Sequence, residues 1–197
     1  MKSFKKLTYS LFLFIFTFAF AQTATAQERP QIGIKGGINF ATFNDVDDVE
    51  YRPGLVAGAF LDLPIENSPI SIQPEVLFAQ YGSNIENSDA YFEADYVQFP
   101  VLFKVDFVSE SATTPNIYFG PYLSFNTGSE VKNDNIAINL EDETEPTDFG
   151  AVVGLGFDTE HAQLGVRYTA GVTKVEDASF ESDAKNGAFS VTLGIKF

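Results

Sequence analysis

The chain has 197 residues, enough for one domain, and its 27 acidic residues against 12 basic ones give it a net charge of −15. So negative a chain is not expected to bind nucleic-acid phosphates. Cysteine is absent, which excludes disulfides and thiolate metal sites.

Residues 1–26 carry the pattern of a secretory signal peptide. Three lysines precede an apolar core at residues 11–21, and Ala24-Thr25-Ala26 supplies the small-x-small cleavage pattern. The alternative, an N-terminal anchor helix, is disfavoured because the apolar run is shorter than the ~20 residues that a membrane span needs. We therefore expect an exported protein whose mature domain covers residues 27–197.

The rest of the chain repeats a strand pattern eight times, with apolar side chains at every second position. Such a period of two is typical of a β-strand with one apolar face. The clearest copy places Leu193, Ile195 and Phe197 opposite Thr192 and Lys196. The eight stretches cover residues 31–40, 53–63, 70–81, 97–107, 117–126, 148–158, 163–172 and 188–197. The alternation is least regular in the second stretch, and the pattern does not fix its register.

The connections between these stretches alternate in length. Those after the second, fourth and sixth stretches are short and cover residues 66–69, 109–114 and 159–160. Those after the first, third, fifth and seventh are longer and cover residues 41–52, 82–94, 127–146 and 174–186. Outer-membrane barrels have short periplasmic turns and long external loops. We therefore predict an all-β fold, an eight-stranded antiparallel up-and-down transmembrane β-barrel in the cell outer membrane.

The long connections hold 17 of the 27 acidic residues, and the run Glu141-Asp142-Glu143-Thr144-Glu145 is the densest. Such a run is usually a solvated loop. The alternative is a surface that bridges lipopolysaccharide phosphates through divalent cations, since paired carboxylates bind hard cations.

The two faces of the strands indicate which one meets lipid. A soluble barrel, as in lipocalins, would turn its apolar face inward around a ligand. Here the other face is mostly Gly, Ser, Ala and Tyr, and the apolar face carries no Lys, Arg, Asp or Glu. A basic residue facing lipid at mid-depth costs ~2–4 kcal/mol. We therefore expect the apolar face to meet acyl chains and the small residues to fill a narrow interior.

Five charged residues on the small-residue face are candidates for an interior network. Lys35, Glu75, Lys104 and Arg167 fall at comparable heights, and Asp106 falls lower. Isolated buried charges are costly, whereas paired ones are tolerated. We therefore predict an interior charge network in which Glu75 pairs with Arg167 or Lys104. Structural closure of the interior is the main interpretation, and a proton or ion path is the alternative.

Three prolines, Pro74, Pro100 and Pro121, lie inside predicted strands. A closed barrel has no free edge at which a missing N–H is harmless, so we predict a bulge at each.

Five segments in succession resemble signatures of the PorT-like outer-membrane β-barrel family of Bacteroidota. They are Gln73-Pro74-Glu75-Val76-Leu77, Tyr96-Val97-Gln98-Phe99-Pro100-Val101-Leu102, Gly120-Pro121-Tyr122, Asp148-Phe149-Gly150 with Gly154 and Gly156, and Arg167-Tyr168 with Gly171. The resemblance covers the mature chain, implies an eight-stranded barrel and includes the three prolines. It implies little about activity, and the founding member's link to protein secretion transfers to no residue here.

No catalytic arrangement emerges from the sequence. The only histidine, His161, lies beside Glu160 in a short turn, and neither a serine nucleophile elbow nor a phosphate-binding glycine loop is present. We expect no enzymatic activity, no cofactor and no metal site.

The sequence thus favours an integral outer-membrane barrel with a structural, adhesive or accessory role and an interior plugged by side chains. The alternatives are a narrow porin-like channel for ions or very small solutes, and a secreted lipocalin-like barrel that binds an apolar ligand. Expected partners are the lipid bilayer, lipopolysaccharide and the outer-membrane insertion machinery, whose recognition signal the aromatic Phe197 resembles. Neither a specific protein partner nor a transported solute is indicated.

Overall fold

The computed structural model describes residues 29–44, 49–85, 91–107, 112–133, 136–139, 147–174 and 185–197. The predicted signal peptide and the acidic run at 141–145 lie outside these residues. Within the described part of the chain, no helix has the length and apolar character needed to cross a membrane.

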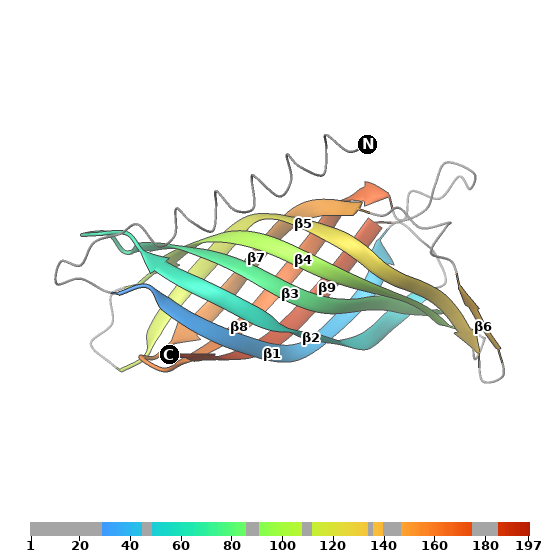
Figure 1. Cartoon of the computed structure of the whole chain (residues 1–197), viewed down its shortest axis with the longest axis horizontal. Coiled ribbons are helices and arrows are strands. Elements are labelled where there is room, and N and C mark those ends of the chain that lie inside the picture. The colour runs from blue at the N-terminus through green and yellow to red at the C-terminus, as the bar shows by residue number, and fades with distance from the viewer. Residues whose placement is uncertain are drawn as a thin grey trace, which may run out of the picture.

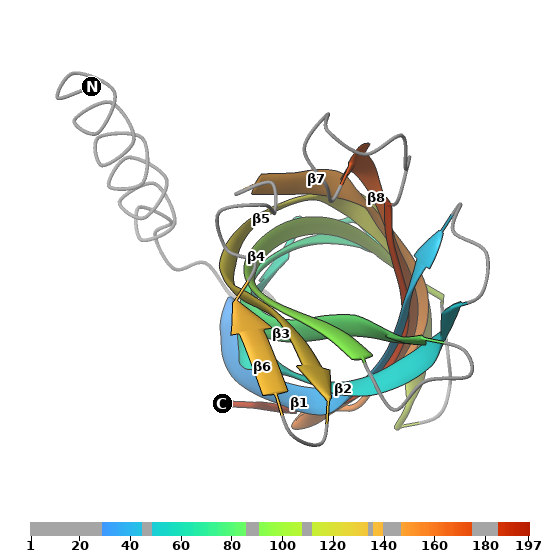
Figure 2. The ribbon, with the colours of Figure 1, turned by 90° about the vertical axis from the view of Figure 1, so that its right-hand side faces the viewer.

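Eight long strands form a closed antiparallel barrel (Figures 1 and 2). Each pairs with its neighbours in the sequence, and the last strand closes on the first, with Ile38 opposite Val191. The predicted fold class is confirmed. The described strands are β1 (Gln31–Asn44), β2 (Val49–Pro64), β3 (Ile70–Ile85), β4 (Tyr91–Asp106), β5 (Thr114–Asn133), β6 (Ile136–Asn139), β7 (Thr147–Asp158), β8 (Ala162–Lys174) and β9 (Lys185–Lys196).

The strands reach further toward the long-loop end than the sequence pattern predicts. β3 continues to Ile85, β4 begins at Tyr91, and β5 runs to Asn133, where it forms a hairpin with the short β6. This hairpin projects from one end of the barrel in Figure 1. The predicted loops 82–94 and 127–146 are therefore partly strand. An alternating apolar face is required only within the ~25 Å membrane band, so the sequence signal fades before the strand pairing ends.

Apolar side chains point outward along every barrel strand. β7 is the most regular case, because exposed and buried residues alternate along its whole length. Val153 and Leu155 are 58% and 62% exposed, whereas Asp148 and Asp158 are buried. In β2, whose register the sequence left open, Val56, Phe60 and Asp62 face inward (these three are buried). This arrangement is the reverse of a lipocalin-like barrel with an apolar interior.

The bulges predicted at the three prolines are wrong. On β3 and β4, Pro74 pairs with Val101 and Leu77 with Gln98, so the register is unchanged across the prolines. β4 and β5 likewise keep one register from Pro100 to Phe103. Each of these two ladders instead loses two residue pairs locally. The register shifts lie elsewhere, between Tyr51 and Val56, between Asp95 and Tyr96, and between Ala170 and Lys174.

The register explains why no extra residue is needed at the prolines. Val101 on β4 pairs with Pro74 on β3 and, where the β4–β5 register is continued, lies opposite Pro121. The missing N–H groups are therefore grouped across three adjacent strands. Gly120 allows the backbones to approach here, since a Cβ at this position would overlap the Val101 carbonyl.

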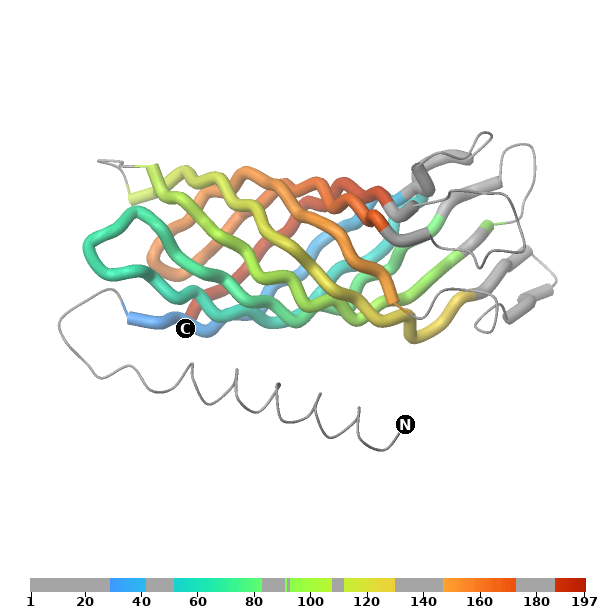
Figure 3. The backbone as a smooth tube through the Cα atoms, turned by 90° about the horizontal axis from the view of Figure 1, so that it is seen from above, coloured from blue at the N-terminus to red at the C-terminus, as the bar shows by residue number. Residues whose placement is uncertain are grey.

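The short turns and the C-terminus lie together at one end of the barrel (Figure 3). In the β2–β3 turn, Ser68 donates its N–H to the Ile65 carbonyl, and Asn67 adopts a left-handed φ of 55°, which asparagine tolerates. Such short turns face the periplasm in outer-membrane barrels. We refer to this side of the molecule as the short-turn end.

Candidate functional site in the barrel interior

The Glu75 carboxylate forms ion pairs with two basic side chains inside the barrel. Lys35 on β1 donates to Glu75 Oε1 at 2.5 Å, and Arg167 on β8 donates to Glu75 Oε2 at 2.9 Å. The Glu75 side chain is completely buried, and those of its partners are at most 7% exposed. β8 lies across the barrel from β3, so the contact of Arg167 with Glu75 crosses the interior, whereas β1 is separated from β3 only by β2.

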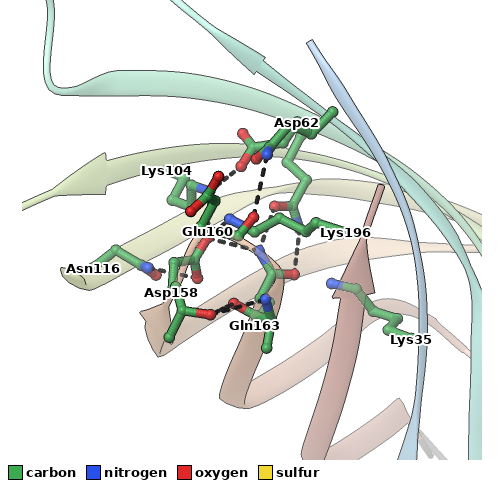
Figure 4. A network of polar contacts seen from close by, with 12 residues as sticks. Lys35, Asp62, Lys104, Asn116, Asp158, Glu160, Gln163 and Lys196 are labelled. Atoms are coloured by element: carbon green, nitrogen blue, oxygen red, sulfur yellow. Dashed lines mark hydrogen bonds and ion pairs between the residues drawn. The ribbon is translucent and has the colours of Figure 1, made fainter. Parts of the chain in front are cut away.

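A second ionic cluster lies closer to the short-turn end (Figure 4). Lys104 on β4 contacts Asp62 on β2 and donates to Asp158 on β7 at 3.0 Å. Lys196 on β9 donates to the same Asp158 oxygen at 3.1 Å, and Asn116 on β5 donates to the other at 3.0 Å. With Gln163 on β8, which also donates to it, Asp158 is held by four strands besides its own.

Two glutamines join the clusters. Gln73 donates to Glu75 at 2.7 Å and accepts from Gln163 at 2.9 Å, while Gln163 also donates to Asp158 at 3.2 Å. Each of the eight barrel strands contributes at least one side chain to the resulting set. We call this set the interior charge network; its members are Lys35, Asp62, Gln73, Glu75, Lys104, Asn116, Asp158, Gln163, Arg167 and Lys196.

The sequence pattern located five of the interior charges, and the structure brings three of them, Lys35, Glu75 and Arg167, into direct contact. Lys104 does not reach Glu75. It pairs in register with Ser71, four residues nearer the short-turn end, which is a difference of ~13 Å at ~3.3 Å per residue. Asp106 lies at the edge of the lower cluster, and it forms no ion pair with any residue that the structure describes.

Sequence reasoning missed three charged members of the network, namely Asp62, Asp158 and Lys196. All three lie on the small-residue face, so the alternation carried the signal that they point inward. Their partners lie on other strands, however, and the pairing depends on how the barrel closes and on its stagger. A local pattern does not contain that information.

Toward the long-loop end, tyrosines fill the interior. Tyr122 donates to Asp148 at 2.7 Å, and Gln98 donates to the Tyr81 hydroxyl at 2.7 Å. The Tyr81 ring packs edge to face against Tyr96, with ring centroids 5.6 Å apart. All these side chains are buried. The interior is therefore occupied by packed aromatic rings as well as by paired charges.

The remaining candidate residues lie at the surface of the short-turn end. His161 and Glu160 are exposed in the β7–β8 turn. Phe197 is 71% exposed, and its N–H donates to the Ile32 carbonyl at 2.8 Å, which continues the pairing of β9 with β1. Over the described ranges, no group of three or more His, Cys, Asp or Glu side chains is arranged to hold a metal ion.

Comparison with known proteins agrees with the barrel fold. The family model described as outer membrane protein beta-barrel domain matches residues 20–177. The fold is similar to that of Neisserial surface protein A (NspA), with 16% identity and a TM-score of 0.52, over 85% of this chain and 97% of that one. It is also similar to the outer membrane enzyme PagL, with 13% identity and a TM-score of 0.53, over 83% of this chain and 98% of that one. No curated protein matches the sequence.

Proposed function

The chain belongs to the family of outer membrane protein beta-barrel domains, and on that basis we propose that it has a structural, adhesive or accessory role with an interior closed by side chains. The protein is an integral eight-stranded barrel of the outer membrane. The proposal concerns what this barrel does there: it presents a surface and does not conduct solutes.

The interior charge network is the observation that supports closure. An eight-stranded barrel leaves room for little more than packed side chains. Here each charged member of the network is paired with an opposite charge, and Glu75 is inaccessible to solvent. A solute on the barrel axis would have to separate these pairs in a buried setting, where breaking an ion pair costs ~3–5 kcal/mol.

Swelling of proteoliposomes tests the proposal. Protein extracted from outer membranes is reconstituted, and the vesicles are transferred to isotonic solutions of glycine, arabinose or potassium chloride. We expect swelling no faster than in protein-free vesicles. Swelling in any of these solutes that scales with the amount of protein would reject closure.

A narrow channel is the second candidate, favoured by one observation. A pocket of about 590 Å³ lies at the short-turn end, lined in part by Lys104 and Lys196 of the interior charge network. The interior is therefore not filled along its whole length. The swelling assay decides between the candidates, because only a channel would pass potassium chloride.

Three narrower assignments belong to the same proposal. The signatures between Gln73 and Gly171 support a PorT-like member of the family, and the N-terminal pattern supports a signal peptide at residues 1–26 ahead of a barrel domain at 27–197. N-terminal sequencing of the membrane-extracted protein tests the second assignment, and we expect it to begin at Gln27. We also propose no catalytic activity; PagL is an outer membrane enzyme with a similar fold, so this point needs a direct activity assay.

The proposed partners are those of an outer-membrane barrel. The bilayer and lipopolysaccharide would contact the outward apolar residues and the loops, and the insertion machinery would recognise Phe197, whose exposed ring supports this role. Replacement of Phe197 by Ala is expected to lower the amount of heat-modifiable barrel in the outer membrane. Equal amounts of the variant and the wild type would remove this assignment.

A further inference from the structure

The pocket at the short-turn end has features that neither closure nor lipid contact requires. It lies beside the lower cluster of the interior charge network, and its volume is about 590 Å³. Residues from β1, β2, β3, β4, β5, β7 and β9 line it, together with Arg29 and residues of the short turns. It is large enough for a molecule the size of an amino acid or a short amine.

Three polar atoms in this pocket have no hydrogen-bond partner among the residues that the structure describes. Asp62 Oδ1, Ser71 Oγ and Asp106 Oδ1 are buried and make no hydrogen bond with the described residues. Asp62 and Ser71 are only 4% and 3% exposed. A buried polar group without a partner costs ~1–3 kcal/mol, so a ligand, ion or water that supplies the partner is favoured at these atoms.

The register places these three residues on the same face of adjacent strands. Ser71 on β3 pairs with Pro64 on β2, two residues from Asp62, and with Lys104 on β4, two residues from Asp106. Ser71 is therefore a diagonal neighbour of each carboxylate, whereas the two carboxylates lie four residues apart along the sheet. All three residues line the pocket.

The charged residues of the pocket indicate the charge of the ligand that it would bind. Its lining contains Arg29, Lys104 and Lys196 against four carboxylates, those of Asp62, Asp106, Asp158 and Glu160, and so has an excess of one negative charge. Both lysines already contact Asp62 or Asp158. Asp106 has no ion pair among the described residues and is the carboxylate that a bound cation would neutralise.

We propose that this pocket binds a small organic cation through a primary ammonium group, which donates to Asp106 and Ser71. An ammonium group has three N–H donors and can therefore serve both of these unpaired oxygens. A metal ion fits less well, because Lys104 already occupies the other Asp62 oxygen and the described residues contain no arrangement of three metal ligands. A closed barrel and a narrow channel would both retain this pocket, so the inference stands apart from the proposed function.

Calorimetric titration with three probes of similar length tests the inference. The detergent-solubilised protein, extracted from outer membranes, is titrated with 1,5-diaminopentane, 1,5-pentanediol and glutarate. The variant Asp106→Asn removes the unpaired charge with little change in shape. Glu66→Gln is the matched control, because it makes the same charge change in the exposed β2–β3 turn, outside the pocket lining.

We expect saturable binding of the diamine to the wild type, unchanged binding to Glu66→Gln, and at least tenfold weaker binding to Asp106→Asn. The diol and glutarate should not bind. Retained heat-modifiable migration of Asp106→Asn on gels establishes that it is folded, and Ser71→Ala serves as a second variant with the same expected direction. Absence of diamine binding, equal binding to the wild type and both pocket variants, or binding of glutarate in its place would overturn the inference.

Discussion

Arg167 and Glu75 join opposite walls of the barrel. They lie 92 residues apart in the chain, and Arg167 Nη1 donates to Glu75 Oε2 at 2.9 Å. In the closed strand order, β8 and β3 are separated by three strands on either side. Their contact therefore spans the interior directly and, together with Lys35, closes the barrel at this level.

Glu75→Gln should destabilise the barrel strongly. The substitution leaves Lys35 and Arg167 buried without an opposite charge, and removal of one partner from a buried ionic group costs ~3–5 kcal/mol. Urea unfolding in lipid vesicles, followed by gel migration, measures the change. Glu66→Gln serves as the exposed control and should shift the free energy of unfolding by less than ~0.5 kcal/mol.

Replacement of Lys35, Glu75 and Arg167 together should destabilise the barrel far less than replacement of Glu75 alone. In the triple variant Lys35→Met, Glu75→Leu and Arg167→Met, no buried charge is left unpaired, and such replacements are often neutral or stabilising. We expect the triple variant to be more stable than Glu75→Gln in the same urea series. A triple variant less stable than Glu75→Gln would show that the loss of stability comes from altered packing and not from the unpaired charge.

Gly120→Ala should impair folding, whereas Gly36→Ala should not. A Cβ at position 120 would overlap the Val101 carbonyl, a backbone atom that cannot move alone. A Cβ at position 36 would meet only the Val56 carbonyl, at 3.9 Å, which is an ordinary contact. The fraction of folded protein in the outer membrane, measured by heat-modifiable migration, distinguishes the two. Similar folded fractions would contradict the close approach at Gly120.

The faces of the strands could be read from the sequence because alternation is a local property. In the stretch 148–158 the alternation places Phe149, Val153 and Leu155 on the lipid side and Asp148 and Asp158 in the interior, as the structure has them. The same reasoning located Lys35, Glu75 and Arg167 on the interior face. Strand number and the antiparallel order also follow from local patterns, because each connection is a hairpin.

The register between neighbouring strands could not be predicted from the local alternation. Glu75 contacts Lys35 and Arg167 but not Lys104 because of the stagger between strands, which is a property of the closed barrel. The prolines show the same limit. Whether a missing N–H requires a bulge depends on how the neighbouring strands lie beside it, and here Val101 lies between Pro74 on one neighbour and Pro121 on the other.

Gln163→Leu tests whether the two ionic clusters act together. Gln163 donates both to Gln73 and to Asp158, so its loss removes the link between Glu75 and Asp158. We expect destabilisation of ~1–3 kcal/mol, since the Gln73 carbonyl is left without a donor. In a double-mutant cycle with Gln73→Leu, the two effects should be non-additive by ~0.5–3 kcal/mol. Strict additivity would indicate two independent clusters.

The absence of tryptophan allows a direct measure of orientation. In Leu193→Trp, whose parent side chain is 60% exposed on the outer face, fluorescence should be quenched strongly by lipids with brominated acyl chains. In His161→Trp, in the exposed β7–β8 turn, acrylamide in the water should be the stronger quencher. Quenching of Trp at position 193 by acrylamide but not by brominated lipid would contradict the orientation.

Single-channel recording on two proteins tests the closed interior most directly. The wild type is compared in planar bilayers with a folded variant carrying Lys35→Ala, Glu75→Ala and Arg167→Ala, which shortens the side chains that cross the interior. We expect no steady conductance for the wild type, and openings confined to the variant would show that the contacts of Glu75 supply the closure. Steady conductance of equal size in both proteins would contradict a closed interior.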